Sequence, residues 1–161
     1  VQAALGQIFN RGPEPAKFQA CLPLLRDFQD PDAWAYVVEQ AGSSDVGRVR
    51  TALNWIGDTK RVEQPPPPRL LRQLEKLVAG EAGQRRAVVL VLAKFGGQES
   101  IGRVIPLVAD PDEMVAKEAE TCLYSQPDRA LVQRLLNDAA RGTNPVLQNR
   151  ARDLMAKIGR S

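Results

Sequence analysis

Few residues in this 161-residue chain could carry out chemistry. Histidine is absent, which excludes a Ser-His-Asp triad, a histidine-assisted cysteine nucleophile and any histidine metal ligand from this chain. The two cysteines, Cys21 and Cys122, cannot form a structural zinc site alone. Paired carboxylates such as Asp110 and Asp112 stand before an apolar run, where acidic residues are typical of a helix start. We therefore predict that the chain is not an enzyme and has no catalytic residue, no metal site and no cofactor.

The rest of the chain places apolar residues at spacings of three and four, which is typical of amphipathic α-helices rather than strands. Aspartate, asparagine or proline opens most of these runs and glycine closes them, as helix caps do. Most connections are a few residues long, so neighbouring helices should form antiparallel hairpins in an all-α fold. The expected helices cover residues 1–10, 15–29, 31–42, 45–57, 67–80, 82–96, 98–109, 111–125, 127–141 and 145–159.

The second helix of each expected hairpin repeats one pattern of small and medium apolar residues. The matching segments read VRTALNWIG at 49–57, VVLVLAKFG at 88–96, AKEAETCLY at 116–124 and ARDLMAKIG at 151–159, with a looser match, CLPLLRDFQ, at 21–29. This repetition predicts a single domain over residues 1–161. Its units cover residues 1–29, 31–57, 67–96, 98–125 and 127–159, with a Pro-rich loop at 58–68. Because the chain starts at Val1 rather than methionine, we expect a piece of a longer protein.

These units resemble HEAT repeats, in particular the short bacterial and PBS-lyase HEAT-like kind. The shared pattern is an Asp-Pro-like helix start, an apolar-Arg pair, a small residue and a closing Leu/Ile-Gly. It is carried by Asp45…Val49-Arg50…Ala52…Ile56-Gly57, by Asp112…Ala116-Lys117…Ala119…Leu123 and, with shifted spacing, by Asn144-Pro145…Ala151-Arg152…Ile158-Gly159. The third unit departs from the pattern, with Val89 in the arginine place, and the first unit is weak throughout.

The resemblance implies a right-handed α-solenoid of about five stacked hairpins, in which each hairpin covers the apolar face of the next. It also implies a structural ladder of acidic and basic residues that bridges helix starts to neighbouring turns. The ladder residues would be Asp45, Arg50, Asp112, Lys117 and Arg152.

The same resemblance predicts where a partner would bind, because second helices in HEAT-like solenoids tend to line the concave side. Trp55 lies with Arg48 and Thr51 on a stripe that differs from the apolar one, so Trp55 is either an exposed anchor or packs under the following loop. We predict a non-enzymatic scaffold or adaptor that binds another protein. Its contacts would be Arg48, Thr51, Trp55, Leu90, Lys94, Arg150 and Lys157.

Two alternatives rest on other members of the HEAT-like class. One is nucleic-acid binding or DNA repair, since alkylpurine DNA glycosylases of this class cradle duplex DNA in a basic concavity with aromatic residues. Beside Trp55, it would use a patchy rim of arginines at positions 48, 50, 85, 86, 150 and 152. The other is a bilin-lyase-like accessory protein, which rests on fold analogy alone.

Charge and composition leave further choices open. The net charge is +3, but residues 97–128 carry −5 and residues 129–161 carry +5, which indicates either two solvated surfaces or a basic end that docks an acidic partner. The four prolines at 65–68 form either a stiff spacer or a ligand for an SH3 or WW domain.

The apolar run AVVLVLA is too short for a membrane span. With two cysteines expected as buried free thiols, we predict a soluble, cytoplasmic protein.

Overall fold

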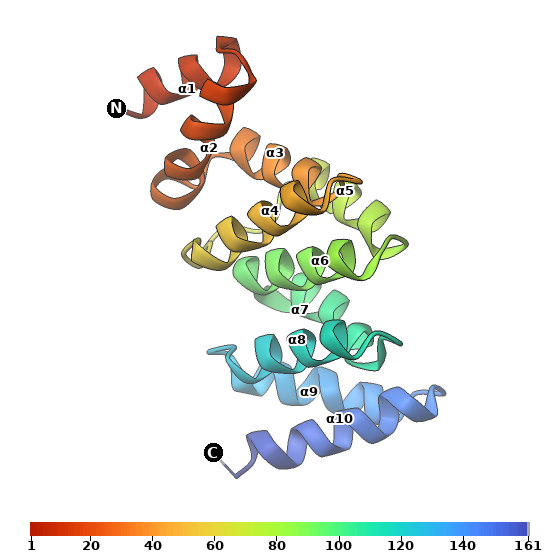
Figure 1. The fold of residues 1–161 in the computed structure, drawn as a ribbon. Helices are drawn as coiled ribbons and strands as arrows, with labels where there is room; N and C mark the ends of the chain where they lie inside the picture. Colours follow the sequence, from red (N-terminus) through yellow and green to blue (C-terminus); the bar gives the residue numbers. More distant parts are fainter. Residues whose placement is uncertain (161) are drawn as a thin grey trace.

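The computed structural model describes residues 1–160, and every regular element within them is a helix (Figure 1). Ten are α-helices and one is a short 3-10 helix, so the all-α prediction is confirmed. The elements are α1 (Gln2–Arg11), α2 (Glu14–Phe28), α3 (Pro31–Ala41), α4 (Val46–Asp58), α5 (Pro68–Val78), α6 (Ala82–Phe95), α7 (Gly97–Val104), η1 (Ile105–Ala109), α8 (Glu113–Tyr124), α9 (Arg129–Ala140) and α10 (Pro145–Ile158).

Side-chain caps explain where several of these helices begin. The carboxylate of Asp30 accepts hydrogen bonds from two amides at the start of α3, and Asp45 and Asp112 do the same for α4 and α8. Asp128 and Asn144 each accept one amide, at the starts of α9 and α10. Capping satisfies amides that would otherwise have no partner inside the helix, and each cap typically contributes about 1 kcal/mol.

One predicted helix is shorter than expected, and proline is the cause. Residues 98–109 were expected to form a single helix, but α7 ends at Val104 and the chain continues as the 3-10 helix η1. Pro106 has no backbone N–H to donate to the carbonyl of Gly102, and its ring disfavours a regular helical turn before it. The expectation of one continuous α-helix was therefore wrong.

The helices pack as consecutive pairs that follow one another along the molecule. The elements α1 and α2, α3 and α4, α5 and α6, η1 and α8, and α9 and α10 pack against each other. Figure 1 shows α4, α6, α8 and α10 one below another, with α3, α5, α7 and α9 behind them and the two termini at opposite ends. Direct packing of α4 on α6 and of α6 on α8 joins successive pairs.

A continuous apolar core runs through the pairs. Trp34 on α3 is 1% exposed, and its ring lies 5.1 Å from the ring of Phe95 on α6. Alanines at 52 and 119 are fully buried, which lets the second helices approach closely. Cys21 and Cys122 are buried free thiols, as predicted, and burial raises the pKa of each to about 12. Both therefore stay protonated and pack as small apolar groups.

The segment between α4 and α5 lies on the body of the protein. Val62 is buried, and its amide donates to the carbonyl of Lys94 on α6 at 3.0 Å. The side chain of Gln29 donates to the carbonyl of Arg61 at 2.9 Å. Pro66 is buried, so the proline run is anchored to the fold between two helices that it spaces apart. No helix among the described residues is long and apolar enough to cross a bilayer.

Candidate interaction surface

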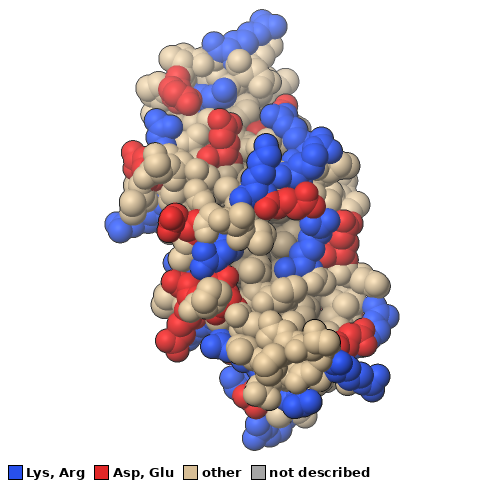
Figure 2. Space-filling view, turned by 90° about the vertical axis from the view of Figure 1, so that its right-hand side faces the viewer, with Lys and Arg blue, Asp and Glu red and all other residues tan. Residues whose placement is uncertain are grey.

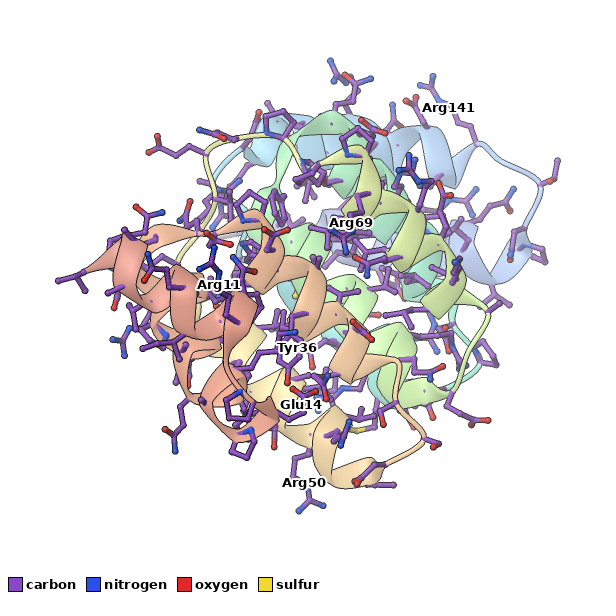
Figure 3. The ribbon with its side chains drawn as sticks, turned by 90° about the horizontal axis from the view of Figure 1, so that it is seen from above. Arg11, Glu14, Tyr36, Arg50, Arg69 and Arg141 are labelled. Atoms are coloured by element: carbon purple, nitrogen blue, oxygen red, sulfur yellow. The ribbon has the colours of Figure 1, made fainter. Side chains whose placement is uncertain are left out.

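The seven residues predicted to contact a partner all lie on α4, α6 and α10, but the structure distributes them over separate places. At the start of α4, Arg48 is exposed and its guanidinium lies 3.5 Å from the side-chain oxygen of Gln40. Close by, the hydroxyl of Tyr36 donates to Glu14 at 3.4 Å, and Figure 3 shows these two side chains together. Burial and the Glu14 carboxylate raise the pKa of Tyr36 to about 12, which keeps that hydroxyl a donor. Thr51 donates to the carbonyl of Gly47 in its own helix at 2.9 Å, so its hydroxyl is already bonded.

Trp55 is half-buried and packs against a neighbouring helix. Its ring lies 4.3 Å from the ring of Phe18 on α2, tilted by 48°. The side chain also borders the main core, and the Trp55 carbonyl accepts a hydrogen bond from the Thr59 hydroxyl at 2.7 Å. Trp55 therefore helps to pack α2 against α4, and only part of its side chain remains exposed to solvent.

We expect Trp55→Ala to lower the free energy of unfolding by roughly 1–2 kcal/mol, because it removes a half-buried aromatic pair. Asn54→Ala is a matched control on the same helix, since Asn54 is exposed, and should change stability by less than about 0.5 kcal/mol. Urea unfolding of both variants measures the difference. Equal stability of Trp55→Ala and the parent chain would contradict the packing role and favour a free surface anchor.

Leu90 and Lys94 are brought together in one hollow of about 260 Å³ on the face made by α4, α6 and α8, which Cys122 also lines. The ammonium of Lys94 donates to the carbonyl of Gly57 at 2.8 Å and to that of Thr59 at 2.5 Å. Burial lowers the pKa of Lys94, although the nearby Cys122 and Asp58 oppose the shift. Lys94 thus binds carbonyls at the end of α4, where a cation is favoured by the helix dipole.

Arg150 and Lys157 on α10 both reach one carboxylate, that of Glu120 on α8. The separations are 3.9 Å for Arg150 and 3.7 Å for Lys157. These groups are partly exposed, so the pairs contribute little to stability and orient the two side chains toward α8. The predicted contacts therefore form three clusters, around Arg48, around Lys94 and around Glu120.

The predicted ladder residues have mixed placements. Asp45 and Asp112 cap their own helices. Arg50 points away from the body in Figure 3, and within residues 1–160 neither it nor Lys117 makes an ion pair. Arg152 lies 3.4 Å from the carbonyl at the end of α9.

A bridge between neighbouring turns is made by a pair that sequence reasoning did not select. Arg85 on α6 donates to both carboxylate oxygens of Asp110, at 2.8 and 2.9 Å, and to the carbonyl of Gly80 at 2.7 Å. Burial alone would raise the pKa of Asp110, but the hydrogen bonds from Arg85 and from the Asp112 amide outweigh it and leave the pKa below its ordinary value. The signal in the sequence was the Asp-Pro pair before α8, together with an arginine one turn into α6.

An open apolar groove of about 390 Å³ lies away from these clusters, between α5 and α7, with α6 as its floor. The Arg103 guanidinium on α7 and the Glu75 carboxylate on α5 meet at 2.8 Å, and both residues line the groove. Gly102 lines the α7 side, and nothing lies within 4 Å of the position where its Cβ would be. The apolar lining residues are Leu71, Leu74, Val78, Val88, Leu92 and Leu107.

The groove follows from the pattern of α5. Leu71, Leu74 and Val78 recur at spacings of three and four and so share one face of the helix. A second stripe, Leu70 and Leu74, is buried against the core, which leaves the outer part of the apolar face uncovered. Val78 is 43% exposed. The sequence indicates this groove, because the apolar residues of α5 cover a wider face of the helix than the part that packs on the core.

The solvent side of α5 is basic. Arg69, Arg72 and Lys76 are all exposed, and Figure 3 places Arg69 on this helix. Arg69 has one exposed ion pair, at 3.6 Å to Asp32, whereas Arg72 and Lys76 have none among the described residues. Figure 2 shows Lys and Arg side chains gathered in the upper half of the face it presents. A cationic stripe therefore runs along the solvent side of α5, and none of its three residues lines the apolar groove.

Within residues 1–160, no group of three His, Cys, Asp or Glu side chains is placed to hold a metal ion. Comparison of the chain with protein-family models, with curated proteins and with solved structures finds no match.

Proposed function

We propose that this chain is a non-enzymatic protein-interaction module. Its helix pairs would form a right-handed α-solenoid of about five HEAT-like hairpins that presents a surface to a protein partner. The order of the pairs along the molecule and the side-by-side second helices support this architecture. So does the repeated Asp-capped helix start at Asp45 and Asp112.

The groove between α5 and α7 is the observation that carries the proposal. Exposed apolar surface that is concave and rimmed by charge is typical of a binding site, because water there is displaced favourably by an apolar ligand. Val78 is 43% exposed and Leu71 is half-buried, so these two supply such a surface on the α5 wall, whereas Leu74 and Leu107 line the groove as buried residues. We therefore place the principal contact of the module here, with the face of α4, α6, α8 and α10 as a secondary candidate.

The nucleic-acid alternative receives less support. Of the rim arginines, Arg85, Arg86 and Arg150 are held by carboxylates of their own chain. The positive charge of such an arginine is partly compensated by its carboxylate, so the arginine contributes less to the binding of a phosphate backbone. The bilin-lyase alternative gains no residue-level support, so we do not develop it.

A groove-filling variant tests the proposal. Gly102→Leu should project a side chain into the open space of the groove and reduce capture of a protein partner by about tenfold, a loss of roughly 1.4 kcal/mol in binding. The measurement is affinity capture with the whole chain as bait, followed by quantitative mass spectrometry.

Two matched variants make the result interpretable. Gly102→Ala adds only a methyl group, so it should keep the partner and raise stability by up to about 1 kcal/mol through higher helix propensity. A Trp55→Ala, Arg48→Ala double variant alters the other face. If the double variant loses the partner while Gly102→Leu retains it, the groove is not the contact and the face predicted from the sequence is.

A further inference from the structure

We propose that the start of α7 is a binding site for the phosphoryl group of a small ligand. The site lies in a hollow of about 490 Å³ between the loop that follows α4 and the junction of α6 with α7. None of the residues that line this hollow lines the groove between α5 and α7, so the inference goes beyond the function proposed above and does not depend on it.

The first turn of α7 offers backbone donors. The first amides of an α-helix have no acceptor inside the helix, and they point out of its N-terminal end, where the helix dipole favours an anion. Within residues 1–160 no side chain caps α7, whereas an aspartate or asparagine caps α3, α4, α8, α9 and α10. All five residues at positions 96–100 line the hollow. Their amides are therefore placed to bind an anion that enters it.

Ser100 is the observation that points to a ligand. It is 1% exposed, and its hydroxyl has no hydrogen-bond partner in the described part of the chain, although a buried hydroxyl is normally bonded. The carbonyl that usually accepts from a helical serine lies four residues earlier. Here it belongs to Gly96, whose φ of 64° and ψ of −160° lie outside the helical range. Helical side chains lean toward the N-terminal end of their helix, so that of Ser100, which lines the hollow, is directed toward the same end as the first amides.

Arg61 brings a cation to the same turn. Its loop is fixed to the body, because the Val62 amide donates to the Lys94 carbonyl and the Gln29 side chain donates to the Arg61 carbonyl. The guanidinium lies so close to Gly96 that a Cβ at that position would collide with it. Arg61 makes no ion pair with any described residue, so no carboxylate of the chain compensates its charge. A guanidinium of this kind suits the oxygens of a phosphate.

Two carboxylates also line the hollow, and they oppose an anion to different degrees. The carboxylate of Glu99 lies 3.3 Å from Arg103, one turn further along α7, and this pair partly compensates its charge. Glu63 is exposed and has no ion pair among residues 1–160, so it weakens the binding of an anion. Arg134 on α9 acts in the opposite direction, because it donates to the side-chain oxygen of Gln98 at 3.0 Å and so adds positive charge beside the first turn.

The set of donors selects a phosphoryl group. Backbone amides, a hydroxyl and a guanidinium meet at one turn, and a phosphoryl group has three acceptor oxygens with which to satisfy all of them. A carboxylate has only two such oxygens. The hollow is larger than a phosphoryl group, so the rest of the ligand would lie along the loop, where Pro65 is an exposed lining residue.

Nuclear magnetic resonance of the isotope-labelled whole chain tests the site. Titration with inorganic phosphate, and separately with phenyl phosphate, should shift the amides of residues 97–100 most, and the shifts should saturate. Arg61→Ala should weaken binding about tenfold, the loss of one charge-assisted contact. Ser100→Ala should weaken it about fivefold, and it should leave the fold intact because the hydroxyl that it removes has no partner in the described chain.

Two further variants separate this site from general attraction of anions to a basic protein. Glu63→Gln removes the opposing carboxylate and should strengthen binding about twofold. Arg50→Ala is the matched control, since Arg50 is an exposed cation that points away from the body in Figure 3, and it should leave the affinity unchanged.

The two probes identify the source of the phosphoryl group. Equal affinity for both supports a site for free phosphate, and saturation by phenyl phosphate alone supports a phosphate monoester. Shifts that do not saturate, or that centre on the cations of α5, would overturn the site. So would equal effects of Arg61→Ala and Arg50→Ala, or an unchanged affinity of Ser100→Ala. None of these results bears on the capture experiment with Gly102→Leu, which decides the proposed function separately.

Discussion

Trp34→Ala is expected to lower the free energy of unfolding by about 3–5 kcal/mol, the range for removing a large aromatic side chain from a packed core. Trp34 is 1% exposed, and it joins α3 to α6 through its contact with Phe95. The cavity left by alanine would lie where one helix pair meets the next. Stacked pairs depend on their neighbours for burial, so we also expect a less cooperative transition. Urea unfolding followed by circular dichroism measures both quantities.

Trp34→Phe is the matched control. The indole N–H of Trp34 is buried without a hydrogen-bond partner among the described residues, so its removal relieves an unfavourable desolvation. Phenylalanine keeps the ring contact with Phe95 and loses some volume. These effects oppose each other, and the variant should stay within about 1.5 kcal/mol of the parent chain. A loss as large as that of Trp34→Ala would show that ring volume alone does not explain the role of Trp34.

Asp110→Asn should lower the free energy of unfolding by roughly 2–4 kcal/mol, because it leaves the guanidinium of Arg85 without its carboxylate. The side chain of Asp110 is 4% exposed and that of Arg85 is 19% exposed, so water replaces the lost partner poorly. The bond from Arg85 to the Gly80 carbonyl would remain, which limits the loss. Chemical unfolding at neutral pH measures the change. Asp138→Asn, at an exposed position on α9, should have almost no effect.

The pair between Arg85 and Asp110 also predicts how stability depends on pH. The folded-state pKa of Asp110 is below its ordinary value, so folding favours the carboxylate form. Its contribution is therefore fully present above the unfolded pKa of about 4 and is lost as the pH falls through the lower folded pKa. Asp110→Asn should lose less stability than the parent chain between neutral pH and this acid range. Equal acid sensitivity of the two proteins would contradict the assignment.

The helices could be predicted from the sequence because their signals are local. Asp45 and Asp112 were expected to start helices, and each accepts two amides there. The prediction of one α-helix over residues 98–109 was wrong for a reason that is also local. Pro106 has no backbone N–H to donate within an α-helix, and the prediction considered only the spacing of the apolar residues.

The interaction surface was harder to predict because it depends on which neighbours cover each helix. Trp55 lies off the apolar stripe of α4, yet Phe18 from another pair covers part of it. Lys94 looked like a free cation on a surface stripe, but carbonyls at the end of α4 bind it. The groove arises for the converse reason: α7 is short and carries Gly102 where a covering side chain would stand. The spacing of apolar residues within a single helix does not predict any of these contacts with neighbouring elements.

Hydrogen–deuterium exchange of the whole chain, alone and with a captured protein partner, tests the central claim most directly. The account predicts slower exchange in α5 and in residues 97–107 when the partner is bound, and predicts that Gly102→Leu abolishes this protection. Protection confined to α4, α6, α8 and α10, with α5 and α7 unchanged, would contradict it.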